Sequence, residues 1–172
     1  DQPLVTRYLS WLADAVRGDL GTSFAQANFA SFTGTSQENL AAVASQIAPR
    51  FANTMFLAGV TAAIAVPLAV GLGILAALYR NSVFDKAANI FTLSSISSPE
   101  FFLAYILILF LAVLNPLLPS LSNIYSDMGL GARLERTLLP ALTLTLVVTA
   151  HMMRMTRAAI INLLASPYIE MA

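Results

Sequence analysis

Residues 55–79 read MFLAGVTAAIAVPLAVGLGILAALY, and this stretch contains no charged side chain. As an α-helix it is roughly 37 Å long at about 1.5 Å per residue, which exceeds the roughly 30 Å hydrocarbon core of a bilayer. It is apolar on every side, whereas a helix on the surface of a soluble domain keeps a polar face. The stretch therefore predicts a helix that spans a membrane.

Two features of this stretch concern its shape and its packing. Pro67 is expected to kink the helix, which membrane helices tolerate. Ala69, Gly73 and Ala77 recur at intervals of four residues, and a stripe of small residues allows a second helix to approach closely. The alternative is that Gly is simply common in membrane helices.

The composition favours a membrane protein and excludes several other classes. Of the 172 residues, 58% are hydrophobic and 10% are charged, against about 25% charged in a soluble domain. The nine basic and nine acidic residues balance, so we predict no nucleic-acid partner. The sequence has no cysteine, which excludes disulfides, thiolate metal sites and a cysteine nucleophile. The sequence begins at Asp1 without a methionine or a signal-like segment and stops at Ala172 without a terminating signal. We therefore expect it to be part of a longer protein.

The apolar runs predict an all-α polytopic membrane fold with three spans, at about 51–79, 83–114 and 138–157. Ser82 and Asp85 have capping-box spacing and are expected to start the second span. Thr137 is expected to cap the third span, after a loop over residues 115–136.

Residues 1–50 form a separate external segment in this prediction. Its first helix is amphipathic, because apolar residues recur at helical spacing from Leu4 to Val16. A turn at 17–21 ends that helix. A short second helix is expected at 37–48, ending at Pro49.

A polar break interrupts the second span. Residues 101–114 alone cover only about 21 Å as a helix, which is too short to cross a bilayer. Ser98 is expected to cap the second half, with Pro99 in its first turn. The span is therefore expected to be one bent element or a pair of joined half-helices.

Polar side chains inside the apolar helices form a candidate substrate path. Three serines before the break share one helix face, two threonines of the third span share another, and an acid within an apolar run can line a polar pathway. The candidate path residues are Ser94, Ser97, Ser98, Glu100, Thr145 and Thr149. The alternatives are hydroxyls bonded back to their own helices and an acid favoured by the first turn of a half-helix.

No catalytic set is present, and no phosphate-binding loop occurs. We therefore predict neither enzymatic activity nor a cofactor. His151 and three nearby methionines, Met152, Met153 and Met155, fit a soft-metal site. These methionines point in different directions around a helix, so packing is favoured and no metal site is predicted.

Four short motifs occur in the order found in one family of transporters. They are RGDLGTSF at 17–24, SSPEF at 97–101, LPALTL at 139–144, and SPYIEMA at 166–172, which follows RMTRAA at 154–159. Together they resemble the B-type permeases of the dipeptide/oligopeptide/nickel ABC importers, over nearly the whole chain. The last motif resembles the start of the family's EAA loop, here kept as Glu170 and Ala172, and the loop at 25–37 is longer than usual.

The resemblance implies a type I ABC importer permease fold in a bacterial or archaeal cytoplasmic membrane, with further membrane helices before Asp1 and after Ala172. It implies a path for peptides or a related small solute, delivered by an external binding protein. It also implies a second permease subunit in a heterodimer and cytoplasmic ATPases, contacted by a coupling helix at 166–172. The coupling residues in that helix are Tyr168, Ile169, Glu170, Met171 and Ala172.

Two other functions and several substrates stay open. The chain could be a channel subunit or a structural membrane scaffold without ATP coupling, although no pore ring is visible in the sequence. Dipeptides, longer peptides, nickel chelates and glutathione all occur as substrates in the family that it resembles.

The distribution of basic residues predicts the orientation. Arg80 and Lys86 share one side of the membrane with Arg154 and Arg157, and the side richer in Lys and Arg is cytoplasmic. The loop at 115–136 is then external.

We expect Ser126→Cys to react with an impermeant thiol reagent in intact cells, and Ser82→Cys to react only after permeabilisation. Both variants are made in the full-length protein without other cysteines. Labelling of Ser82→Cys but not Ser126→Cys from outside would reverse the orientation.

Overall fold

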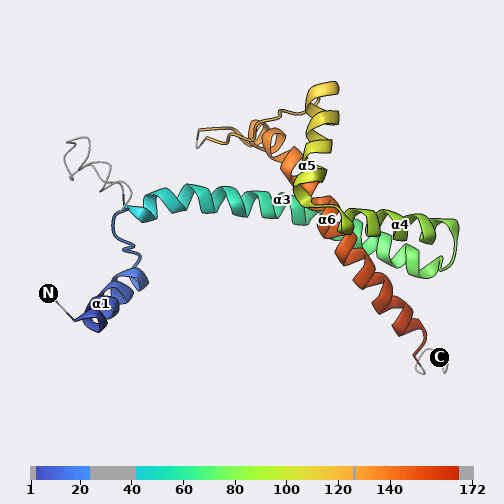
Figure 1. Cartoon of the computed structure of the whole chain (residues 1–172), viewed down its shortest axis with the longest axis horizontal. Coiled ribbons are helices and arrows are strands. Elements are labelled where there is room, and N and C mark those ends of the chain that lie inside the picture. The colour runs from blue at the N-terminus through green and yellow to red at the C-terminus, as the bar shows by residue number, and fades with distance from the viewer. Residues whose placement is uncertain (1–2, 24–41, 126, 167–172) are drawn as a thin grey trace. The chain divides into compact units, whose positions relative to one another are not determined.

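The computed structural model describes residues 3–23, 42–125 and 127–166, and within them every regular element is a helix (Figure 1). The chain divides into two units, Asp1–Thr54 and Met55–Ala172. The predicted all-α class is therefore confirmed for the described residues. Among the described residues, two helices are long and apolar enough to cross a membrane, and the number rises to the predicted three if a bent helix pair counts as one span.

In the first unit, helix α1 (Leu4–Val16) ends at a glycine turn. Gly18 and Gly21 have φ angles of 88° and 71°, a backbone conformation that glycine adopts without steric cost. The Asp19 carboxylate accepts the Gly21 N–H at 2.9 Å. The helix and the turn agree with the prediction for 1–21, although residues 1–2 lie outside the described part.

Helix α3 runs without interruption from Val43 to Leu78. It passes through both Pro49 and Pro67, so the prediction that a helix ends at Pro49 is wrong. A proline removes one backbone hydrogen bond, and at Pro67, which lies in the apolar run, the remaining bonds keep the helix the favoured conformation.

The second span is broken as predicted. Helix α4 (Val83–Ser97) and the following pair, α5 (Glu100–Ile108) and the π-helix η2 (Leu109–Leu114), meet at an angle of 105°. The Asp85 N–H donates to Ser82 Oγ at 3.2 Å, which confirms the predicted cap of α4.

The predicted cap of the second half-helix is wrong. Pro99 occupies the cap position of α5 and no side chain caps it. The Ser98 hydroxyl instead donates to the Ser94 carbonyl at 2.9 Å. The Ser94 carbonyl also accepts the Ser98 N–H at 3.2 Å, so the Ser98 side chain bonds to the helix that it ends and not to the helix that follows.

Helix α6 extends from Leu130 to Leu164 and begins eight residues earlier than predicted. The Thr137 hydroxyl donates to the Arg133 carbonyl at 2.6 Å, so it lies inside the helix and does not cap it. The predicted start is too late because the charged residues at 133–136 lower the local hydropathy, although they do not interrupt the helix. Arg133 lies over the Phe56 ring, 4.3 Å from its centroid, which places its charge against an aromatic face.

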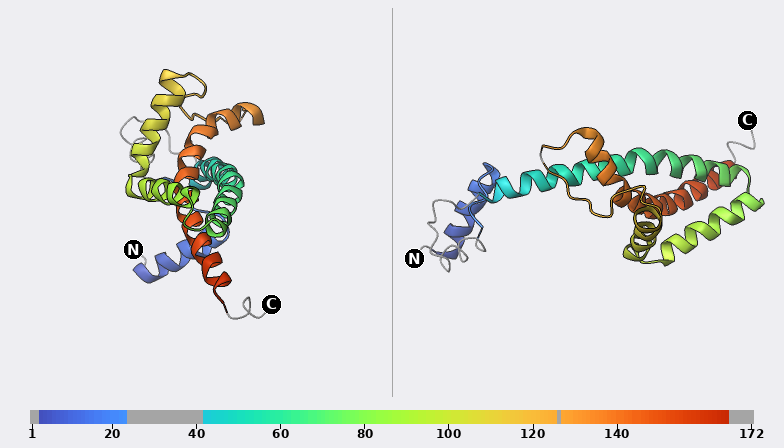
Figure 2. Two further views of the ribbon diagram at one scale, coloured as in Figure 1. Left: turned by 90° about the vertical axis from the view of Figure 1, so that its right-hand side faces the viewer. Right: turned by 90° about the horizontal axis from the view of Figure 1, so that it is seen from above.

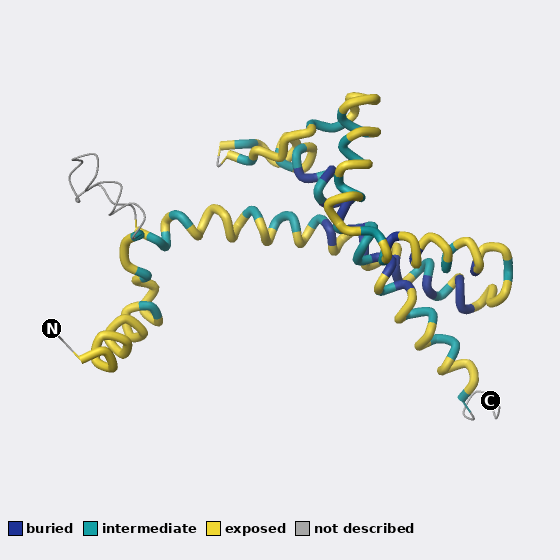
Figure 3. Tube along the Cα trace, in the orientation of Figure 1, coloured by how far each residue is buried: buried dark blue, intermediate teal, exposed yellow. Residues whose placement is uncertain are grey.

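Helix α6 is the common partner of the other helices in the second unit. Helices α4 and α5 both pack on it, and α3 crosses it (Figure 2). Phe56 of α3 lies by Arg133 of α6, and Gly73 lies by Thr156. The buried positions gather where these helices meet (Figure 3), and on α3 they are Thr61, Ala65, Ala69, Gly73, Ala76 and Ala77.

The closest approach occurs at Gly73. A Cβ atom there would lie 2.7 Å from Thr156 Cβ and 3.0 Å from the Met153 carbonyl oxygen. A methyl group cannot be accommodated without moving one helix. The predicted stripe of small residues is thus a packing surface, and α6 is the helix that packs against it at Gly73.

We expect Gly73→Ala to destabilise the protein by about 1–3 kcal/mol, as overpacking does. The matched control is Gly71→Ala in the same helix, where an added Cβ meets nothing within 4 Å. That substitution should stabilise by about 0.5–1 kcal/mol, because Ala favours a helix interior. Thermal unfolding of the full-length protein in detergent measures both, and equal melting temperatures would contradict the close approach.

Candidate functional site

The break between α4 and α5 places Glu100 beside a cavity. The cavity has a volume of about 420 Å³ and lies between α5, α6 and the segment after η2. Its lining residues are Leu57, Glu100, Phe101, Ala104, Ile108, Ser120, Ser122, Leu139, Pro140, Thr143 and Leu144. Glu100 is also in the first turn of α5, as one of its two predicted settings requires, and its place on a substrate path stays a prediction.

The other predicted path residues on α4 lie near this cavity in sequence but do not line it. Ser94 and Ser97 are exposed, and Ser98 is half-buried. The bond from Ser98 to the Ser94 carbonyl is the back-bonding that was left open as the alternative.

The predicted threonines are in a different environment. Thr145 and Thr149 are buried on α6, and their hydroxyls have no hydrogen-bond partner within the described part of the chain. Thr61 on α3 is in the same condition. The buried threonines and the exposed serines therefore do not share a surface in this structure, and their place on a common path stays a prediction.

The polar residue of α6 that does line the cavity is one that sequence reasoning missed. Thr143 is on its wall, and its hydroxyl donates to the Leu139 carbonyl at 3.1 Å. It lies two residues before Thr145, and the helical spacing used to group Thr145 with Thr149 did not include it.

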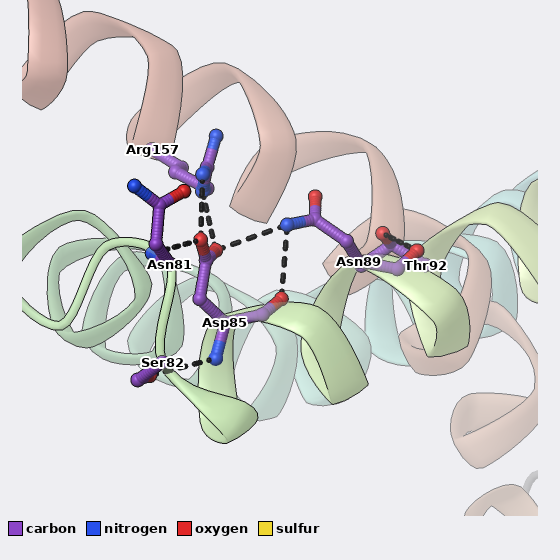
Figure 4. Close-up of polar contacts among 6 residues, drawn as sticks. All are labelled: Asn81, Ser82, Asp85, Asn89, Thr92 and Arg157. Atoms are coloured by element: carbon purple, nitrogen blue, oxygen red, sulfur yellow. Dashed lines mark hydrogen bonds and ion pairs between the residues drawn. The ribbon is translucent and has the colours of Figure 1, made fainter.

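A second polar cluster joins the start of α4 to the end of α6 (Figure 4). Arg157 Nε donates to Asp85 Oδ1 at 2.7 Å, and Arg157 Nη2 donates to Oδ2 at 2.8 Å. The Asn89 side-chain amide donates to Oδ1 and the Asn81 N–H to Oδ2, both at 2.9 Å. Each carboxylate oxygen thus accepts two hydrogen bonds, and the Asp85 side chain is only 4% exposed.

The turn before α4 is shaped to complete this cluster. Asn81 has a φ of 64°, the left-handed conformation that asparagine tolerates better than most residues. Sequence reasoning found Asp85 as a capping residue and Arg157 as a basic residue of the cytoplasmic side. It did not pair them, because they are 72 residues apart.

His151 lines a cavity of about 280 Å³ with Ile96, Arg154, Met155 and Ala158. Met155 lines this cavity together with His151, whereas Met153 is buried and does not line it. Among the described residues, no group of three His, Cys, Asp or Glu side chains could hold a metal ion.

The predicted coupling residues 168–172 lie outside the described part of the chain. Helix α6 ends at Leu164, and Ala165 is its C-cap.

Comparison with known proteins connects this arrangement to membrane transport. A family model described as a binding-protein-dependent transport system inner membrane component matches residues 69–172. A protein of Brucella suis that bears the name of a peptide permease is 32% identical over 174 residues, covering 100% of this chain and 51% of its own length. The glutathione transport system permease protein of Escherichia coli K12 is 31% identical over 172 residues, covering 100% and 49%. The chain thus spans about half the length of the curated relatives that it matches.

Proposed function

Because the chain belongs to the family of binding-protein-dependent transport system inner membrane components, we propose that it forms part of the translocation path of an ATP-driven importer. The family match carries this proposal, since it covers α4, the break, α5 and α6. It also supports a bacterial inner membrane as the location.

The importer needs partners that this sequence does not supply. The sequence has no phosphate-binding loop, so ATP hydrolysis belongs to separate cytoplasmic subunits. The family description names dependence on a binding protein, which delivers the solute to the external side. A second permease subunit completes the path.

The proposed solute is a peptide or glutathione, because relatives carry the names of peptide and glutathione permeases. Both solutes contain an ammonium group and carboxylates. The Glu100 carboxylate can accept hydrogen bonds from an ammonium group, and its cavity of about 420 Å³ is within the usual range for a small-molecule site. We propose that Glu100 contacts the solute as it enters between α5 and α6.

We expect vesicles that contain the full-length permease, its partner subunit, the ATPases and the binding protein to take up radiolabelled dialanine or glutathione only with ATP. Glu100→Leu should lower the uptake rate by about 10- to 100-fold, because a hydrogen bond to a charged group contributes about 1.5–3 kcal/mol. The protein should still insert in the membrane.

Glu135→Leu is the matched control, since Glu135 is an exposed acid on α6 that does not line the cavity. Its uptake should equal that of the wild type. Normal uptake by Glu100→Leu would contradict the proposed solute contact. The remaining role of Glu100 would be its favourable interaction with the N-terminal end of α5. Uptake by the wild type without ATP would instead support a channel.

We also propose that residues 166–172 begin the helix that contacts the ATPase. The family model extends through this segment, and α6 leads directly to it. A proline one residue after a serine can start a new helix, and apolar side chains such as Tyr168 supply contact energy at interfaces.

Glu170→Lys and Tyr168→Ala should each reduce the ATPase that co-purifies with the full-length permease and should lower uptake. Amounts of inserted permease should stay equal to the wild type. Normal ATPase retention and transport in both variants would exclude this segment as the coupling element.

A further inference from the structure

The ion pair between Asp85 and Arg157 fixes the relative orientation of the two side chains as well as the distance between them. The two hydrogen bonds run in parallel from one guanidinium edge to the two oxygens of one carboxylate. Such a bidentate pair restricts the rotation of one group relative to the other, which a single point contact does not. The angle between α4 and α6 is therefore constrained at this point.

The remaining contacts hold the carboxylate still. Asn89 and Asn81 each occupy one further acceptor position of Asp85. The carboxylate is consequently attached to both the turn before α4 and the first turns of α4 itself. A buried ion pair of this kind adds little net stability over an apolar pair of the same size. Its main effect is therefore to constrain the angle between α4 and α6.

The ion pair is close to the end of the packed part of α6. Thr156 touches Gly73 of α3, and Arg157 follows it. From residue 158 to the helix end at Leu164, no residue is buried. These last seven residues extend about 10 Å at 1.5 Å per residue.

The last two turns of α6 are also separated from the end of α3. A cavity of about 210 Å³ lies between them, lined by Ala77, Arg80, Ile161, Leu164 and Ala165. Close packing on α3 therefore does not set the direction of this helix end. The Asp85–Arg157 ion pair immediately precedes these last turns of α6, so it is placed to set their direction.

We propose that the Asp85–Arg157 pair is a positioning element, which sets the direction in which the end of α6 presents residues 166–172 to the ATPase. The inference rests on the importer function proposed above. It assigns to Arg157 a role that depends on its bidentate geometry, beyond its positive charge.

Arg157→Lys is the decisive variant, because lysine keeps the charge and loses the parallel pair of bonds. In the vesicles described above, uptake per ATP hydrolysed should fall at least fivefold, whereas the melting temperature and the ATPase activity stay close to wild type. The exchange variant Asp85→Arg with Arg157→Asp should regain part of the coupling. Arg154→Lys is the matched control, one turn away on the same helix, and should couple normally.

A distance measurement separates positioning from folding. Spin labels at Lys86→Cys and Leu164→Cys, both exposed sites, report the separation of the start of α4 and the end of α6. Arg157→Lys should broaden that distance distribution. An unchanged distribution with lost coupling, or normal coupling in Arg157→Lys, would overturn the proposal.

Two further outcomes are decisive. If Arg157→Lys does not fold, Asn89→Ala replaces it, since it frees Asp85 Oδ1 from one restraint and keeps the charges. A fall in uptake per ATP then supports the proposal, and normal coupling overturns it. Failure of ATP-dependent uptake in the wild type itself would reject the importer function, and this inference with it.

Discussion

A polar atom buried inside a protein has no water to bond to, and this constraint governs where the polar atoms of the second unit lie. The Asp85 carboxylate accepts four hydrogen bonds and is almost completely buried. The hydroxyls of Thr92, Ser98 and Thr143 bond to carbonyls of their own helices. The buried hydroxyls of Thr61, Thr145 and Thr149 are exceptions, because they have no hydrogen-bond partner within the described residues.

The same constraint explains why the second span can be broken where it is. A bend of 105° frees backbone groups at Ser98 and Pro99, and these need partners or access to water. The Ser98 N–H and hydroxyl both donate to the Ser94 carbonyl. Proline has no N–H to satisfy. Irregular backbone at membrane depth is tolerated where it is buried in protein or lines a water-filled cavity, and this break lies beside the Glu100 cavity.

Helix α6 connects the two polar regions of the unit. Its first half borders the Glu100 cavity through Thr143, and its second half carries Arg157. Helix α6 is continuous over 35 residues, so both regions lie on one element. The close contact at Gly73 keeps α3 beside it. One helix thus relates the proposed solute contact to the proposed coupling end.

The sequence by itself determined the helical class, the two long apolar helices and the break between α4 and α5, because hydropathy, length and proline position act locally. It also identified Ser82 as the cap of α4 and the small stripe around Gly73 as a packing surface. Only the tertiary structure decided which helix fills that stripe, where α6 begins, and which α6 threonine lines the cavity. Above all, it decided that Asp85 meets Arg157 across 72 residues, since a pairing between distant segments depends on how helices pack and has no signature in local spacing.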